Sequence, residues 1–399
     1  MRKSTILYIV ALALLLCTQL GNLRDFLTSR TMSCEEMIYD ALWEERDSVA
    51  LMGYRLSPEE LSEHWAHVIH DNAELFYVAD RYEYKSIGGL VLSAHPIYAV
   101  SGEELELARQ VYADTLQGIL DTVHEEWTDL QTALYLHDYL CSHYAYDDSL
   151  TRYSAYELLT DGTGVCQAYT LVYDALLTAC GIESSYVISR EMNHSWNVVT
   201  IDGKQYNVDV TYDDPSPDRL GKVEHTHFLV SDSKLSEDHR FAPDEGFGQC
   251  SDSFYDDKAI WENVSTAFVP IGKDFYYIKS GMLHRWDGSE SEYIDTIYAT
   301  WFTDRGDQSY WRGNYSALLS YKDKLLYSKP DCIMSYDPAN GRFEVFYKHS
   351  YGPDIYGFQI KDDQLLLQLS TSPNDEGIIQ TAKLPYWFIS KGVFYLVNR

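Results

Sequence analysis

Two strand-like runs joined by Asp202-Gly203 constrain the fold of this chain more than any other segment. Asp-Gly is a strong signal for a two-residue hairpin turn, and such a turn places Ile201 opposite Lys204. The first run covers 194–201, and the return run is predicted to cover 204–212. Because side chains alternate between the two faces of a strand, this register determines which residues share a face.

The predicted register places a histidine and a carboxylate on one face of the hairpin. His194 and Asp209 become diagonal neighbours, roughly 7 Å apart at Cα and within side-chain reach. A carboxylate in that position fixes the tautomer of an imidazole and stabilises its protonated form. Trp196, opposite Asp209, is a candidate either for lining a cleft or for packing. The other face of the return run is predicted to pack into the core, through Tyr206, Val208, Val210 and Tyr212.

Cys166 is predicted to begin a helix. Gly162 and Gly164 provide a turn before it, an apolar stripe follows over 168–179, and Gly181 is a natural C-terminal stop. Unpaired N–H groups and the positive end of the helix dipole favour a thiolate at such a position and can hold an oxyanion. Cys180 lies at the opposite end of the same helix, where the field has the opposite sign, and is predicted to be structural.

The order of these motifs resembles the transglutaminase-like superfamily, and more narrowly its bacterial exported branch. The matching segments are Gly164-Val165-Cys166-Gln167-Ala168-Tyr169, His194-Ser195-Trp196-Asn197 and Val208-Asp209-Val210-Thr211-Tyr212. The resemblance covers about 130–239 and implies a papain-like α+β core. It also implies a catalytic triad of Cys166, His194 and Asp209, with acyl transfer through a thioester.

The resemblance implies protein, peptide or cell-wall amide substrates and no cofactor. We favour hydrolysis slightly over cross-linking, because water is abundant and no amine-binding site is visible in the sequence. Some members of the family are inactive binding domains. The alternative is therefore a catalytically silent surface binding or scaffold protein that keeps the fold.

The chain has 399 residues, enough for two or three domains. We predict a signal peptide or N-terminal anchor over 1–30, an N-terminal, mostly helical α+β module over 33–125 and the catalytic domain over 126–250. Short aromatic strands over 254–399 predict an all-β C-terminal domain, either propeller-like or a sandwich, that offers a surface for a protein partner. Asp287 and Asp337 lie roughly 50 residues apart, near the period of propeller blades.

The first residues have a targeting pattern. Arg2 and Lys3 precede an apolar run over 6–17, which is short for a membrane span and suits a signal-peptide core. A secreted or surface-anchored protein ranks first. A lipoprotein modified at Cys17 ranks second, because Leu16 stands where a small residue is preferred, and a cytoplasmic protein ranks third.

Charge and cysteine usage exclude several classes of protein. The formal net charge of −30 argues against a nucleic-acid partner, which needs a basic footprint. Seven scattered cysteines without a CxxC pair indicate neither a disulfide scaffold nor a zinc site, so no metal is expected. Five further polar residues are possible ligands or cleft residues but are predicted to be structural: His137, Asp213, Asp214, His225 and His227.

Overall fold

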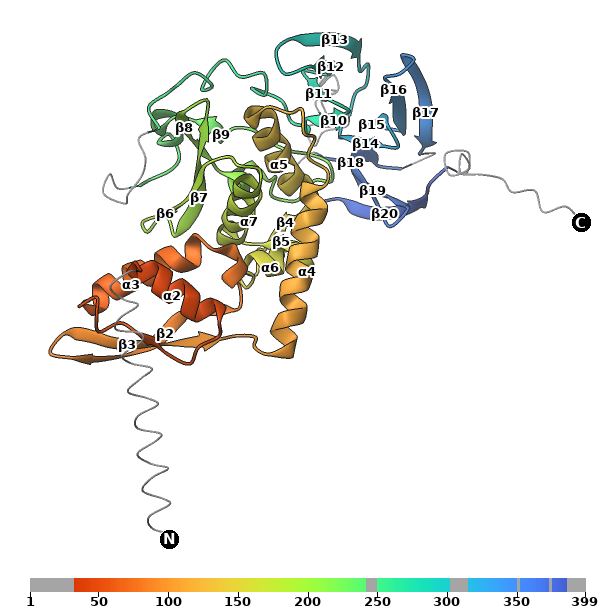
Figure 1. Cartoon of the computed structure of the whole chain (residues 1–399). Coiled ribbons are helices and arrows are strands. Elements are labelled where there is room, and N and C mark those ends of the chain that lie inside the picture. Colours follow the sequence, from red (N-terminus) through yellow and green to blue (C-terminus); the bar gives the residue numbers. More distant parts are fainter. Residues whose placement is uncertain (1–31, 242–249, 302–314, 350–351, 373–374, 386–399) are drawn as a thin grey trace, which may run out of the picture. The chain divides into compact units, whose positions relative to one another are not determined.

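The computed structural model describes residues 32–241, 250–301, 315–349, 352–372 and 375–385. The chain divides into two compact units, Met1–Asp114 and Thr115–Arg399, and combines helices with several separate sheets (Figure 1). The α+β prediction is therefore confirmed. The predicted signal peptide or anchor, with Cys17, lies outside the described residues. Within the described residues, no helix has both the length and the apolar character that crossing a membrane requires.

The first unit packs helices against a small antiparallel sheet of order β1-β3-β2. Its core is formed by apolar side chains of these elements, among them Ile38, Leu61 and Trp65. Ser57 caps α3 with a capping box, as its position before Pro58 predicts. The elements are α2 (Cys34–Trp43), β1 (Val49–Ala50), α3 (Pro58–His70), η1 (Ala73–Leu75), β2 (Val78–Ile87), β3 (Leu90–Tyr98) and α4 (Glu103–Leu120), the last of which continues into the second unit.

The second unit begins with a helical layer on a four-stranded antiparallel sheet. The sheet has the order β6-β7-β8-β9, α7 packs against β7 and β6, and α5 packs against α7 (Figure 1). Its main elements are α5 (Asp129–His143), α6 (Ala155–Asp161), α7 (Cys166–Ala179), β6 (Ser184–Ser189), β7 (His194–Ile201), β8 (Lys204–Val208), α8 (Val210–Asp213), β9 (Phe228–Val230) and α9 (Asp232–Leu235). A short parallel pair, β4 (Ala145–Tyr146) and β5 (Thr163–Gly164), leads into α7.

The β7–β8 hairpin has the predicted register, from Ile201 opposite Lys204 to Asn197 opposite Val208. The prediction of a strand as far as Tyr212 is wrong, because helix α8 replaces its last part. Asp209 is the N-cap of α8, and its carboxylate accepts a hydrogen bond from the backbone N–H of Tyr212 at 3.0 Å. An Asx side chain that captures a backbone donor two or three residues ahead starts a helix in preference to extending a strand.

The C-terminal region consists of three consecutive antiparallel meanders, which confirms the all-β prediction. The first two each have four strands and share a register shift in the third strand, after Leu283 and after Ile333. The described strands form no closed propeller or barrel. The meanders are β10 (Val269–Ile271), β11 (Asp274–Lys279), β12 (Met282–Trp286) and β13 (Ser291–Thr296); β14 (Leu318–Tyr321), β15 (Lys324–Lys329), β16 (Cys332–Asp337) and β17 (Arg342–Lys348); and β18 (Asp354–Lys361), β19 (Gln364–Ser370) and β20 (Ile378–Lys383).

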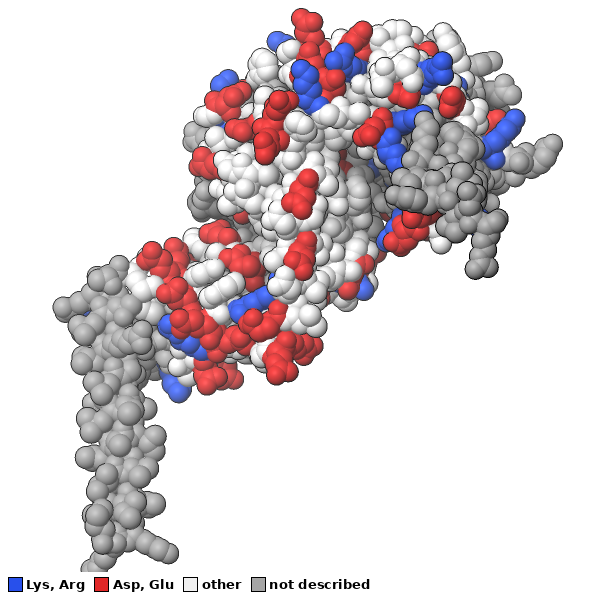
Figure 2. All heavy atoms as spheres, turned by 45° about the vertical axis from the view of Figure 1, so that its right-hand side comes forward, with Lys and Arg blue, Asp and Glu red and all other residues white. Residues whose placement is uncertain are grey.

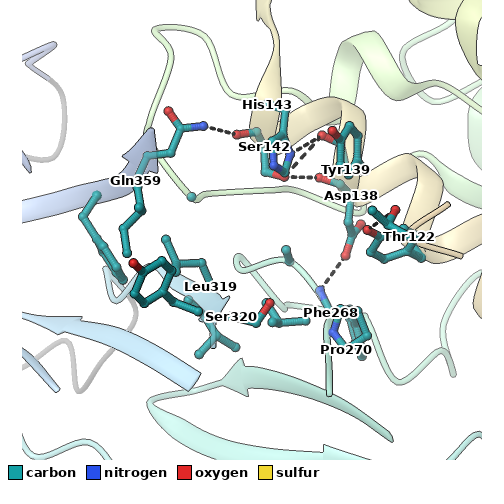
Figure 3. A pocket seen from close by; sticks show the side chains of 18 residues that line it. Thr122, Asp138, Tyr139, Ser142, His143, Phe268, Pro270, Leu319, Ser320 and Gln359 are labelled. Atoms are coloured by element: carbon teal, nitrogen blue, oxygen red, sulfur yellow. Dashed lines mark hydrogen bonds between the residues drawn. The ribbon is translucent and has the colours of Figure 1, made fainter. Parts of the chain in front are cut away.

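The first strands of the three meanders face helix α5 across a cavity of about 470 Å³ (Figure 3). Gln359 on β18 donates a hydrogen bond to the carbonyl of Ser142 on α5, at 3.3 Å. The backbone N–H of Phe268 donates to Asp138 Oδ2 at 2.6 Å. These two bonds tie the β region to α5. The apolar part of the cavity wall is formed by Phe268, Pro270, Leu318, Leu319, Phe358 and Ile360.

On the face of the molecule that Figure 2 shows, acidic side chains are spread widely, with Lys and Arg between them. This distribution agrees with the formal net charge of −30. A surface of this kind keeps a protein soluble and repels polyanions.

The close packing of β5 against α6 and α7 generates a prediction for Gly164. A Cβ atom on Gly164 would lie 2.8 Å from Ala168 Cβ and 3.1 Å from Leu158 Cδ1. Gly164→Ala is therefore expected to lower the free energy of unfolding by about 1–3 kcal/mol through overpacking. Urea denaturation measures the change.

Gly118→Ala is the matched control for this measurement. Gly118 lies in helix α4, and a Cβ atom at this position would meet nothing within 4 Å. The control is expected to leave stability unchanged or to raise it by about 0.5–1 kcal/mol. Equal stability of the Gly164→Ala protein and the unsubstituted protein would contradict the packing argument.

Candidate active site

Cys166 is the first residue of α7, as predicted. Gly162 ends α6 in the left-handed conformation, with φ of 81°, and the chain then turns through β5 into the helix. The N-cap residue Val165 supplies no side-chain acceptor, so no side chain caps the first-turn N–H groups of α7. Cys166 is only partly buried. Its side chain is therefore partly accessible to solvent, and it lies at the positive end of a helix dipole.

His194 begins β7, and Asp209 follows the end of β8. His194 Nε2 lies 2.5 Å from Asp209 Oδ2, and both residues are buried, Asp209 completely. Because Nε2 faces the carboxylate, Nδ1 is the ring atom left to face the thiol. The structure thus brings together the histidine and carboxylate that the hairpin register predicts to be neighbours.

The thiol and the imidazole perturb each other in the direction that nucleophilic chemistry needs. Burial raises the pKa of Cys166, but hydrogen bonds from His194 and Ser195 outweigh it, and the pKa lies below its ordinary value. Burial lowers the pKa of His194, whereas the charge and hydrogen bond of Asp209 raise it, to about 10. These directions favour a thiolate–imidazolium pair at neutral pH.

Asp209 stays ionised although it is fully buried. Burial acts to raise its pKa, but His194 and His239 lower it well below its usual range. His239 Nε2 lies 2.8 Å from the same oxygen, Oδ2, that bonds His194. His239 was not predicted from the sequence, because it lies 30 residues beyond Asp209 without any periodic relationship to it. In the sequence around it, the adjacent Asp238 was the only feature that pointed to a polar contact of His239.

Trp196 and Tyr212 do not occupy the positions that the extended hairpin predicts. Trp196 is buried, and its Nε1–H donates to Asn207 Oδ1 at 3.0 Å, so it packs in the sheet. Tyr212 was predicted to pack into the core, but it is 45% exposed. Helix α8 turns Tyr212 toward the site, where its ring centroid lies 4.9 Å from that of His194. Cys180 caps the C-terminal end of α7, and burial raises its pKa.

The other polar residues singled out in the sequence are buried and hydrogen-bonded. His225 and His227 lie just before β9 and not on a strand. His137 on α5 bonds Asp138 and Asp213, while Asp214 accepts from the hydroxyl of Tyr169. Three groups of His and Asp have potential ligand atoms within 4.8 Å of one another: His137, Asp138, His225; His194, Asp209, His239; and His227, Asp238, His239. In each group these atoms already form His–carboxylate hydrogen bonds, which a cation would have to replace.

The thiolate–imidazolium pair predicts a specific pH profile for alkylation of Cys166. With iodoacetamide, half-maximal alkylation is expected below the value of about 8.5 for a free thiol. His194→Ala removes the hydrogen bond that favours the thiolate, so the profile should move upward. Peptide mass spectrometry locates the label, and Cys180→Ala serves as the control that leaves the profile in place. An identical profile in the His194→Ala protein would contradict the pairing.

Comparison with known proteins identifies the segment that carries this site. Residues 118–210 match the transglutaminase-like superfamily, and this range contains Cys166, His194 and Asp209. No curated protein matches the chain significantly.

Several solved structures align with parts of this chain at low identity and low TM-score. The structure of a TGase is 12% identical, with a TM-score of 0.23, over 33% of this chain and 44% of that chain. A provisionally assigned cysteine protease from Cytophaga hutchinsonii is 13% identical, with a TM-score of 0.21, over 34% of this chain and 63% of that chain. An arylamine N-acetyltransferase from Bacillus cereus with a Cys-His-Glu triad is 9% identical, with a TM-score of 0.20, over 59% of this chain and 92% of that chain. The chain thus spans less than two thirds of the first two structures. The match to the transglutaminase-like superfamily is thus confined to residues 118–210, and members of this superfamily are typically cysteine enzymes.

Proposed function

We propose that the chain is a cysteine-dependent acyl-transfer enzyme whose catalytic domain covers residues 126–250. Cys166 is the nucleophile, His194 the acid and base, and Asp209 the residue that orients the imidazole. The observation that carries the proposal is the bond of 2.5 Å from His194 Nε2 to Asp209, together with the lowered pKa of the partly accessible Cys166. The substrates proposed are protein, peptide or cell-wall amides, and no cofactor is required.

The first half-reaction forms a thioester. The Cys166 thiolate attacks the carbonyl carbon of the amide, and a C–S bond forms as the carbonyl oxygen gains a negative charge. First-turn N–H groups of α7 lie where they can donate to this oxygen, since no side chain caps them. The imidazolium of His194 gives its proton to the amide nitrogen, the C–N bond breaks, and the amine leaves.

The second half-reaction releases the acyl group. Water or a second amine attacks the thioester carbonyl, and His194 accepts the proton of the attacking molecule. The C–S bond breaks, and Cys166 returns as the thiolate beside a protonated His194. We favour water as the acceptor, which makes the enzyme a protease or amidase. An amine acceptor would make it a transglutaminase.

We also propose that the protein acts outside the cytoplasm, as a secreted or surface-anchored enzyme. The basic start and the apolar run over 6–17 support this proposal. The mass of the N-terminal peptide of the mature protein distinguishes a cleaved signal peptide, a retained anchor and a lipid on Cys17. Recovery of the whole protein from the cytoplasm, with its first residues intact, would contradict export.

The alternative is a surface binding or scaffold protein that keeps the fold without catalysis and holds a protein partner through its β region. In this alternative the three meanders hold the partner. It differs from the enzyme proposal in one respect that can be measured: a Cys166→Ala protein would keep its full biological activity.

Labelling with a thiol-directed amide probe tests the nucleophile. The purified protein is expected to react at Cys166, and Cys166→Ala is expected to lose the label. Cys180→Ala is the matched control, because Cys180 lies on the same helix but at its C-terminal end, where burial raises the pKa. The control should label fully. Equal labelling of the unsubstituted and Cys166→Ala proteins would eliminate the proposed nucleophile.

A further inference from the structure

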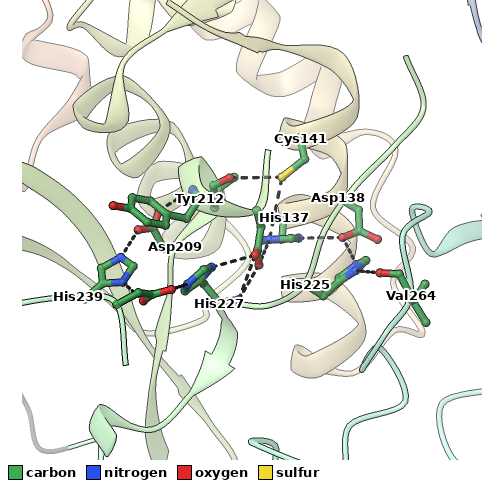
Figure 4. A network of polar contacts seen from close by, with 12 residues as sticks. His137, Asp138, Cys141, Asp209, Tyr212, His225, His227, His239 and Val264 are labelled. Carbon is green, nitrogen blue, oxygen red and sulfur yellow. Dashed lines mark hydrogen bonds and ion pairs between the residues drawn. The ribbon is translucent and has the colours of Figure 1, made fainter. Parts of the chain in front are cut away.

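Asp209 is one member of a continuous chain of alternating histidines and aspartates (Figure 4). Each member bonds the next through side-chain atoms at 2.5–3.2 Å. In order from the candidate nucleophile, the members are His194, Asp209, His239, Asp238, His227, Asp213, His137, Asp138 and His225. We call this set the His–Asp chain.

The far end of the His–Asp chain is tied to the region that leads into the C-terminal meanders. His225 Nδ1 lies 3.2 Å from the carbonyl of Val264, and Asp138 Oδ2 accepts the backbone N–H of Phe268 at 2.6 Å. Asp138 also lines the cavity between α5 and the meanders. The His–Asp chain therefore runs from the candidate active site to the segment before the first meander, and all of its members except Asp238 are buried.

The inner rings of the His–Asp chain have a polar partner on each of their two nitrogens. His239 has Asp238 on Nδ1 and Asp209 on Nε2, and His227 and His137 likewise lie between two carboxylates. His225 lies between a carbonyl and a carboxylate. Contacts on both sides of a ring hold it in one orientation, so each member of the His–Asp chain positions the next.

The His–Asp chain begins beside the candidate nucleophile. His194 has Asp209 on one nitrogen and Cys166 as its other partner. The buried carboxylate of Asp209 is tolerated because it is paired and hydrogen-bonded.

We propose that His239 is a positioning residue for the proposed acyl-transfer reaction, holding Asp209, and through it His194, in the orientation that keeps Cys166 ready to attack. His239 is only 2% exposed, and its two hydrogen bonds, 2.6 Å to Asp238 and 2.8 Å to Asp209, fix the plane of its ring. His239 thus holds Oδ2 of Asp209, while the backbone N–H of Tyr212 holds Oδ1. The groups packed on His239 are His194, Trp196, Tyr212 and His227, together with the two carboxylates.

The test compares two substitutions at one site. His239→Leu removes both donors, whereas His239→Gln keeps one amide donor that can reach Asp209. In His239→Leu, kcat is expected to fall about tenfold or more while KM is unchanged, because only orientation is lost. The half-maximal pH of Cys166 alkylation is expected to rise by about one unit, a tenfold change in the ionisation equilibrium. His239→Gln is expected to recover most of both losses.

His64→Gln is the matched control for a histidine–carboxylate pair outside the His–Asp chain. His64 Nδ1 lies 3.0 Å from Glu35 Oε1 in the first unit, and its loss should change neither kcat nor the alkylation profile. Asp238→Asn provides a second variant that tests the same link, because Asp238 is 49% exposed and its replacement preserves shape. It is expected to shift the alkylation profile in the same direction by a smaller amount.

The proposal is overturned if folded His239→Leu and Asp238→Asn proteins keep the unsubstituted alkylation profile. It is also overturned if the Gln and Leu variants lose activity equally and only in proportion to their loss of stability in urea. The alkylation profile needs no substrate. If the unsubstituted protein shows no acyl transfer, that result counts against the proposed function alone. The alkylation profile of Cys166 still tests whether His239 positions Asp209 and His194.

Discussion

The buried carboxylate of Asp209 is the group on which the candidate site depends. It accepts hydrogen bonds from His194, from His239 and from the backbone N–H of Tyr212, and no part of it reaches solvent. A buried charge costs several kcal/mol unless it is paired and fully hydrogen-bonded. One residue therefore has three roles: it follows the end of β8, it is the N-cap of α8, and it orients the imidazole beside Cys166.

Much of this site could be predicted from the sequence because its determinants are local. The turn at Asp202-Gly203 sets the register of β7 and β8 without help from other residues, and the glycines before Cys166 mark a helix start. The end of the hairpin could not be predicted in the same way. The side chain of Asp209 accepts the backbone N–H of Tyr212, which an extended β7–β8 hairpin would have used in its own ladder of hydrogen bonds. Helix α8 forms as a result and exposes Tyr212.

The His–Asp chain escaped prediction for a different reason. Its members come from β7, from α5, from α8 and its N-cap, from the segment before β9 and from the segment after α9, so the packing of these elements brings them together. Histidine and aspartate at such separations have no periodicity that a strand or helix would explain. In the C-terminal region, short strands and turns were enough to predict an all-β fold. The arrangement of the meanders could not be predicted, because it depends on contacts between residues far apart in the sequence, such as that of Phe268 with Asp138.

The most direct measurement of the central claim is mass spectrometry of an acyl-enzyme trapped by rapid acid quenching after incubation with candidate peptide amides. The account predicts an added mass equal to the acyl part of the substrate, located on the peptide that contains Cys166 and absent from the Cys166→Ala protein. It also predicts that His194→Ala accumulates far less of this species. An acyl group on another residue, or turnover of an amide by the Cys166→Ala protein at the unsubstituted rate, would contradict the account.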